Sequence, residues 1–142
     1  MINEDSKMIL KKGDFQGELP PDHFKFKYEP DHFQLWAFKG INDKDNVLVT
    51  AHTGAGKTAP ALYAIKMWLS QDTENQVIYT APIKTLSNQK FKEFGEYFDN
   101  VGILTGDVKI NPSGNLLIMT AEILRNSLLR KSNEKVYEWN FN

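Results

Sequence analysis

The sequence contains no cysteine, and its three histidines are widely separated along the 142 residues. Disulfide bonds and cysteine-containing zinc sites are therefore excluded, and no histidine metal cluster is indicated. Long apolar runs are also lacking, since no stretch approaches the ~18 apolar residues that a membrane-spanning helix needs. Because the N-terminus lacks the basic start and apolar run of a signal peptide, we expect an intracellular protein, cytoplasmic or nuclear, with no membrane partner.

A marked excess of positive charge is missing as well. The formal net charge is -1, so the uniformly basic composition of many nucleic-acid-binding proteins is absent and any such binding has to be local. Apolar residues make up 41% of the chain, which suffices for one modest core but not for two domains. The aromatic residues that we expect in that core are Trp36, Trp68, Phe91, Phe94, Phe98 and Trp139.

Beyond residue 22 the hydrophobic pattern alternates between short apolar runs and helical periodicity. We expect a flexible tail over 1–22, where neither pattern occurs, and a partial domain over 23–142. The pattern predicts strands at 47–49, 77–80, 102–104 and 116–119, and helices at 31–40, 57–70, 86–98 and 121–131. Strands joined through helices make right-handed crossovers, so the predicted fold is α/β, a parallel sheet with helices on both faces.

The strongest chemical signal is Ala-His-Thr-Gly-Ala-Gly-Lys-Thr at residues 51–58, between a predicted strand and a predicted helix. Such a glycine-rich turn directs backbone N–H groups toward a nucleotide phosphate. In this pattern Lys57 reaches the β- and γ-phosphates and Thr58 ligates Mg²⁺ held with the nucleotide, so both are candidate catalytic residues. The predicted ATP-binding residues of the loop are Thr53, Gly54, Ala55, Gly56, Lys57 and Thr58. The alternative is a tight turn followed by a solvated lysine.

Further segments follow this loop in order. They are Tyr-Thr-Ala-Pro-Ile-Lys-Thr-Leu-Ser-Asn-Gln-Lys at 79–90, Leu-Thr-Gly-Asp at 104–107, Ile-Asn-Pro at 110–112 and Met-Thr-Ala-Glu-Ile-Leu-Arg at 119–125. With them, the sequence from about Tyr28 to Arg130 resembles the superkiller-like group of DExH RNA helicases, superfamily 2 enzymes that include the exosome-associated helicases. The resemblance implies the first RecA-like domain of such a helicase, a P-loop NTPase fold. Ala51, in place of the usual first glycine of the loop, agrees with that superfamily.

The same resemblance implies two contacts to the nucleotide base. Gln34 corresponds to a glutamine whose amide reads the adenine edge, and an amide can pair with both donor and acceptor atoms of adenine. Tyr28 corresponds to an aromatic residue that stacks on the base. The alternative for Gln34 is an exposed amide on a helix.

The segments after the second, third and fourth predicted strands should lie at the carboxyl edge of the sheet, where open α/β folds bind ligands. In the family these segments hold a single nucleic-acid strand by its sugar–phosphate backbone, which does not read sequence. The contacts implied here are Pro82, Lys84, Ser87, Gln89, Thr105, Gly106, Asp107, Thr120, Glu122 and Arg125. Asp107 and Glu122 are acidic, so bracing a loop or capping a helix suits them better than touching phosphate. Ordinary loop and cap chemistry is the alternative for the whole set.

The D-E-x-H tetrad, with which the family orients magnesium and water, is absent from the sequence. We therefore expect a fragment, incomplete at its C-terminal end and without the second RecA-like domain, that cannot unwind nucleic acid by itself. A missing central strand would also leave an apolar sheet edge open. The parent activity that the resemblance implies is ATP hydrolysis coupled to translocation on, and unwinding of, single-stranded RNA, with an RNA-decay complex as a candidate partner.

Three alternatives remain open from the sequence. A DNA helicase of the same superfamily would show the same backbone contacts, because only a group that senses the 2′-hydroxyl separates RNA from DNA. A truncated paralogue could bind nucleotide or nucleic acid without turnover. An unrelated P-loop enzyme, such as a small-molecule kinase, would leave the segments at 82–84 and 105–107 unexplained.

Overall fold

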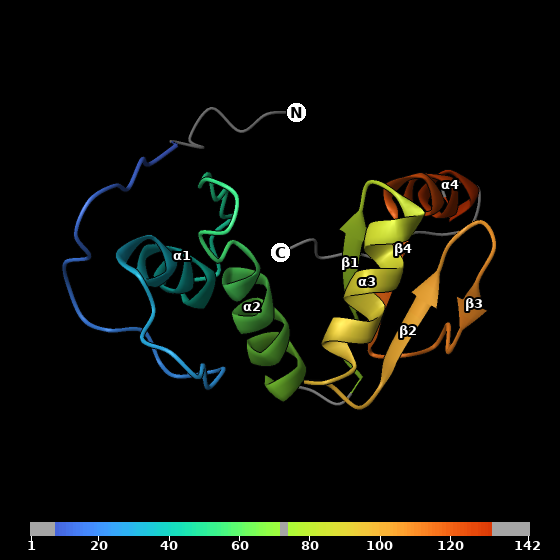
Figure 1. The fold of residues 1–142 in the computed structure, drawn as a ribbon, viewed down its shortest axis with the longest axis horizontal. Coiled ribbons are helices and arrows are strands. Elements are labelled where there is room, and N and C mark those ends of the chain that lie inside the picture. Colours follow the sequence, from blue (N-terminus) through green and yellow to red (C-terminus); the bar gives the residue numbers. More distant parts are fainter. Residues whose placement is uncertain (1–7, 72–73, 132–142) are drawn as a thin grey trace. The chain divides into compact units, whose positions relative to one another are not determined.

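The computed structural model describes residues 8–71 and 74–131, and these form two compact units divided after Met67. The first unit contains α1 (His32–Asn42) and most of α2 (Thr58–Gln71). The second contains a four-stranded sheet with α3 (Lys84–Phe94) and α4 (Ala121–Lys131) (Figure 1). Within the described ranges, no helix is both long and apolar enough to cross a bilayer.

Helix α1 begins at a sequence-encoded start signal. The N-cap Asp31 has extended backbone, and its N–H donates to Oε1 of Gln34, three residues on, at 2.9 Å. This bond satisfies a donor that the helix start would otherwise leave unpaired. The predicted helix at 31–40 is therefore confirmed, and it continues to Asn42.

The core of the first unit is a stack of aromatic rings between the two helices. The ring of Phe38 stacks on Tyr63 with centroids 4.4 Å apart and on Phe26 at 5.3 Å. Ala59 and Met67 of α2 complete this buried cluster. The Tyr63 hydroxyl donates to the carbonyl oxygen of Pro21 at 2.9 Å, so the segment before α1 is fastened to α2.

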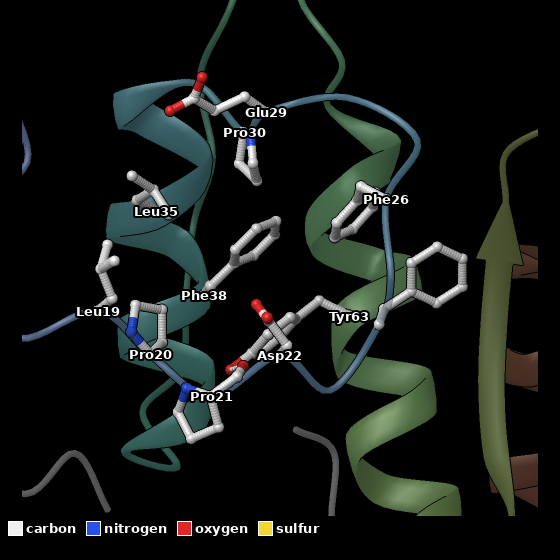
Figure 2. Close-up of a pocket in the computed structure, with 11 residues that line it drawn as sticks. Leu19, Pro20, Pro21, Asp22, Phe26, Glu29, Pro30, Leu35, Phe38 and Tyr63 are labelled. Carbon is white, nitrogen blue, oxygen red and sulfur yellow. Dashed lines mark hydrogen bonds between the residues drawn. The ribbon is translucent and has the colours of Figure 1, made fainter.

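A cavity of about 170 Å³ lies beside this cluster. Its walls come from residues 19–30, from Leu35 and Phe38 of α1, and from Tyr63 of α2 (Figure 2). Burial raises the pKa of Tyr63 to about 12, and the carboxylates of Asp22 and Asp43 add to this effect by opposing a second negative charge. Tyr63 is therefore held in its neutral form.

Residues 8–22 contain no helix or strand, but part of this segment contacts α1. The Trp36 indole N–H donates to the carbonyl oxygen of Gly13 at 3.2 Å, and the backbone N–H of Phe15 donates to Nδ1 of His32 at 2.9 Å. The boundary of a tail at residue 22 stays a prediction.

The predicted strand at 47–49 is wrong. These residues have no strand geometry, and Leu48 is 86% exposed. A strand needs a neighbour to pair with its backbone N–H and C=O groups, and an apolar run does not by itself supply one. An apolar sequence is therefore not sufficient to form a strand here.

The sheet of the second unit contains β1 (Val77–Ala81), β2 (Val101–Leu104), β3 (Lys109–Ile110) and β4 (Leu116–Thr120), in the spatial order β1-β4-β2-β3. β4 pairs in parallel with β1 on one side and with β2 on the other, which confirms the predicted parallel arrangement of those three strands. The short β3 pairs antiparallel to β2 and was not predicted, because its length is too small for a periodic pattern.

Both faces of the sheet are covered at β4. All five residues of β4 are buried, and successive side chains of a strand point to opposite faces. Figure 1 shows α3 lying across the sheet, where it contacts β1, β2 and β4, while α4 contacts β4 and β1. The chain has the α/β fold that the alternation of patterns predicted.

The helices of this unit differ from the prediction at one point. The helix predicted at 86–98 starts earlier, at Lys84, and ends earlier, at Phe94, with Gly95 as its C-cap. Helix α4 matches the predicted 121–131. Of the aromatic residues expected in a core, Phe94 and Phe98 are buried, Trp36, Trp68 and Phe91 are half-buried, and Trp139 lies outside the described residues.

Gly102 is required where two backbones approach each other in the sheet. A Cβ atom there would collide with the carbonyl of Asn111, and it would lie 3.0 Å from Cδ1 of Leu117. Asn111 has a positive φ of 44° and donates from Nδ2 to the carbonyl oxygen of Val101, so its carbonyl cannot easily retreat. Only glycine fits this position of β2.

We predict that Gly102→Ala lowers the free energy of unfolding by about 1–3 kcal/mol, the usual cost of forcing extra atoms into a packed region. Gly95→Ala serves as the matched control, because Gly95 has a right-handed helical φ of -62° at the end of α3. Thermal denaturation of both variants beside the wild type measures the effect. Equal midpoints for the two variants would contradict the close approach at Gly102.

We also predict that Tyr63 makes stability fall at high pH. The folded protein binds the phenolic proton more tightly than the unfolded chain, because the pKa is raised from 10.0 to about 12. The stability contributed by neutral Tyr63 is therefore complete below pH about 10 and is lost as the pH rises through about 12. The observable is the difference in free energy of unfolding between wild type and Tyr63→Phe. It should change across this window, and a pH-independent difference would refute the assignment.

Candidate functional site

The loop at residues 51–57 turns sharply before α2 begins at Thr58. Gly54 and Gly56 have positive φ values of 84° and 88°, a conformation that other residues rarely adopt. The backbone N–H of Ala55 donates to the carbonyl oxygen of His52 at 3.2 Å, which closes the turn. Lys57 is exposed, and Thr58 is half-buried at the helix start. These are the local features that a phosphate-binding loop needs.

Gln34 links this loop to α1. The side chain is 2% exposed, and its Nε2 donates to the carbonyl oxygen of Gly56 at 3.0 Å while Oε1 accepts the N–H of Asp31. A Cβ atom on Gly56 would lie 2.6 Å from Nε2 of Gln34, so glycine is needed for this approach as well as for its φ. Each amide atom keeps one further hydrogen-bonding position, but both already have a partner in the protein.

Tyr28, the second residue expected at the base, lies on the segment before α1. As a residue it is 53% exposed, and its ring centroid is 5.5 Å from that of Phe26, with 44° between the ring planes. More than half of this residue is therefore open to solvent. The structure brings Gln34 and the phosphate loop together, and it places Tyr28 on the same unit.

The predicted nucleic-acid contacts lie on the second unit, in the segments that follow β1, β2 and β4. These strands are parallel neighbours with aligned ends, since Ala81 pairs with Thr120 and Leu104 with Met119. Their following segments consequently meet at one edge of the sheet. The structure thus gathers at this edge residues from three separate stretches of the sequence.

Members of this set differ in exposure. The exposed members are Pro82, Lys84, Gln89, Gly106, Asp107, Glu122 and Arg125. Ser87, Thr105 and Thr120 are buried, with 9% exposure or less. Ser87 Oγ donates back to the carbonyl oxygen of Ile83, as a serine within a helix commonly does. These three side chains are therefore shielded from solvent in this structure.

Thr105 organises the turn after β2. Its Oγ1 accepts the N–H groups of Asp107 at 3.4 Å and of Val108 at 3.1 Å, and its own N–H donates to the carbonyl oxygen of Val108. Asp107, held by this turn, forms an ion pair with Lys84 at 2.7 Å. The role of loop brace that its negative charge suggested therefore agrees with its position, while its place among nucleic-acid contacts stays a prediction.

Two apolar residues at this edge were not singled out from the sequence. Ile83, the N-cap of α3, is 55% exposed, and Leu86 in its first turn is 38% exposed. Exposed apolar side chains at such an edge are available to pack against a bound partner. Their apolar type alone gave no signal, because Ile and Leu are more often buried.

No cluster of three or more His, Asp or Glu side chains that could hold a metal ion occurs among residues 8–71 and 74–131. An ATP-bound Mg²⁺ does not need such a cluster, because phosphate oxygens and a loop hydroxyl supply ligands. The donor set at the phosphate loop, with Thr58 next to Lys57, fits a magnesium ion brought by a nucleotide.

Comparison with known proteins agrees with this arrangement. The family model of the DEAD/DEAH box helicases matches residues 31–140. The chain is 50% identical over 116 residues to Superkiller complex protein 2 of Homo sapiens, covering 82% of this chain and 9% of that protein. It is 49% identical over 118 residues to Antiviral helicase SKI2 of Saccharomyces cerevisiae, covering 82% and 9%.

Exosome RNA helicase MTR4 of Homo sapiens is 51% identical over 102 residues, covering 72% of this chain and 10% of that protein. The chain thus spans about a tenth of the length of the curated relatives it matches. The residues matched by the family model, 31–140, include both the phosphate loop and the three segments at the sheet edge. The chain belongs to the DEAD/DEAH box helicase family.

Proposed function

We propose that this chain forms the ATP-binding part of an ATP-dependent RNA helicase, in which ATP hydrolysis drives translocation on and unwinding of RNA. The observation that carries the proposal is the loop at 51–57, with positive φ at Gly54 and Gly56, directly before α2. Relatives about 50% identical to this chain are named as helicases, and one is named an RNA helicase. The proposed helicase includes a strand with the D-E-x-H tetrad and a second RecA-like domain, which together with this chain would complete the motor.

The phosphate loop would hold ATP through its backbone and Lys57. The N–H groups of residues 53–57 lie in a turn of the kind that surrounds phosphate oxygens, and the start of α2 adds positive potential. The exposed Lys57 ammonium would contact the β- and γ-phosphates, and Thr58 would hold Mg²⁺ with the nucleotide. The bound nucleotide supplies the anhydride bond whose hydrolysis releases free energy.

Gln34 and Tyr28 would recognise the base. Tyr28 presents an exposed ring on which adenine can stack. Gln34 is already engaged with Asp31 and Gly56, so a contact to adenine would add to these bonds or replace one. Base recognition and loop position are then coupled through one amide.

RNA would bind along the carboxyl edge of β1, β4 and β2. Lys84 and Arg125 supply positive charge there, and Gln89 and the backbone supply hydrogen-bond donors. Such contacts hold the sugar–phosphate chain without reading sequence. Since one relative's name includes "exosome" and another's "superkiller complex", we infer that an RNA-decay assembly in the cytoplasm or nucleus is the setting.

Replacing Lys57 tests the ATP site. In the intact protein, Lys57→Ala should lower ATP affinity and RNA-stimulated ATP hydrolysis by on the order of tenfold or more, since a charge-assisted contact to phosphate is lost. Lys66→Ala is the matched control, because Lys66 is an exposed lysine on α2, the helix that follows the loop. Equilibrium binding of a fluorescent ATP analogue and phosphate release measure both effects.

The proposal fails if Lys57→Ala and Lys66→Ala behave alike. Hydrolysis should also rise more with single-stranded RNA than with DNA of the same sequence. Equal stimulation by the two would favour a DNA or general nucleic-acid substrate instead.

Replacing Gln34 separates base reading from loop support. If the amide reads adenine, Gln34→Ala should weaken ATP binding about fivefold more than GTP binding, the equivalent of one hydrogen bond. If it acts only through Gly56, both nucleotides should weaken equally. The exposed Gln16→Ala is the control for loss of a glutamine at a remote position. Titration of each variant with both nucleotides distinguishes the cases.

A further inference from the structure

One ion pair joins two of the segments at the sheet edge. Lys84, the first residue of α3, follows β1, and Asp107 lies in the turn after β2. Lys84 Nζ is 2.7 Å from Oδ2 of Asp107. The two side chains are 52% and 71% exposed, so the pair lies at the surface.

The position of this pair follows from the strand order. β4 lies between β1 and β2, and the ends of all three strands are aligned. A contact between the segment after β1 and the segment after β2 therefore connects the two sides of β4. Helix α4 begins directly after β4, at Ala121. The ion pair thus links the segments that flank the start of α4.

The two partners of the ion pair are positioned in different ways. The backbone of Asp107 is fixed by the hydrogen bonds of the turn to Thr105, whose side chain is 9% exposed. The Lys84 side chain reaches this turn across Gly106, where a Cβ atom would lie 3.3 Å from its Nζ and 3.4 Å from its Cε. Glycine at 106 leaves room for the lysine, whose flexible four-carbon stem allows the ammonium group to move away while the turn keeps its backbone hydrogen bonds.

An ammonium group binds a carboxylate and a phosphate in the same way, through short charge-assisted hydrogen bonds. A lysine that already has an anion at 2.7 Å must leave it, or share its donors, before it can contact a second anion. Exposed ion pairs are weak and shift an equilibrium by less than about fivefold, so a phosphate can displace this carboxylate.

We propose that Asp107 is a built-in competitor for Lys84, so that binding of an RNA phosphate to Lys84 requires the Lys84–Asp107 ion pair to open. Asp107 is then a positioning residue that acts through Lys84 and does not itself touch RNA. The inference rests on the proposed RNA binding at this edge. Because Asp107 competes for Lys84, the affinity for single-stranded RNA is lower than the positive charge of the edge alone would give.

The test compares single-stranded RNA binding by the intact wild-type protein, Asp107→Asn, Lys84→Gln and the double variant. Asp107→Asn should bind RNA about two- to fivefold more tightly at low salt. Lys84→Gln should bind more weakly, and its slope of log affinity against log salt should fall by about 0.7, the value for one phosphate contact on a single strand. In the Lys84→Gln background, Asp107→Asn should bring little further gain.

Asp99→Asn controls for the change in net charge. Asp99 is exposed and precedes β2, whereas Asp107 follows it, so the same chemical change is made at the opposite end of the strand. This variant should leave RNA affinity nearly unchanged at moderate salt, because charges beyond about 10 Å are screened. The gain from Asp107→Asn should shrink as salt rises.

A second measurement does not depend on RNA affinity. Acylation of surface lysines, read by mass spectrometry, should label Lys84 faster in Asp107→Asn than in the wild type, with the exposed Lys44 unchanged. Added single-stranded RNA should protect Lys84 in both proteins. Equal labelling of Lys84 without RNA would overturn the competition.

Further results of the RNA-binding experiment would also overturn the proposal. If Asp107→Asn weakens RNA binding, Asp107 orients Lys84 for binding and the proposal is overturned. If the gain persists in the Lys84→Gln background, Asp107 acts by general repulsion of RNA and the proposal is overturned too. If the wild type binds no single-stranded RNA, the proposed function fails and the inference fails with it, whereas a binding wild type with an unchanged Asp107→Asn sinks the inference alone.

Discussion

Parallel pairing of β4 with β1 on one side and β2 on the other is the constraint on which the second unit depends. It places β4 between two strands in the sheet, where all five of its residues are buried, and it aligns the carboxyl ends of three strands. Because parallel strands must be joined by crossovers, the segments that leave these ends come from distant parts of the sequence. The same pairing therefore produces the core and gathers Lys84, Asp107 and Glu122 at one edge.

In the first unit, the side-chain amide of Gln34 connects two parts of the structure. Gln34 caps the start of α1 through Asp31 and holds the phosphate loop through Gly56. A buried amide without partners would be costly, and both of its groups are satisfied here by backbone atoms. The loop glycines serve two purposes, since Gly56 provides the positive φ and also leaves room for Gln34. A base that binds near Gln34 would be sensed at the phosphates through this connection.

The polar residues at the sheet edge divide into two groups by burial. Thr105, Ser87 and Thr120 face inward, and two of them hold backbone atoms of their own loops. Lys84, Gln89 and Arg125 face solvent. Buried hydroxyls stiffen the loops, and exposed groups on those stiff loops then present charge and donors at fixed places. Lys84, although exposed, already contacts the carboxylate of Asp107 at 2.7 Å.

Local sequence determined much of this protein. Glycine spacing in residues 51–58, the helix start signal at Asp31, helical periodicity, and the apolar runs at 77–80, 102–104 and 116–119 predicted the phosphate loop, the helices and three of the four strands, because these features depend on residues close in the chain. The end of α3 at Phe94 was not predicted. The sequence also predicted the α/β class and the helicase family.

Only the tertiary structure decided what depends on distant partners. The run at 47–49 is apolar enough for a strand, yet it has no strand geometry, while the short β3 forms because β2 lies beside it. Packing also decides which of the predicted contacts are buried. Gln34 donates to Gly56, 22 positions away in the sequence, and Lys84 pairs with Asp107, 23 positions away. Residue type and spacing set which interactions a side chain can make, but the fold selects the partner that is close enough to make them.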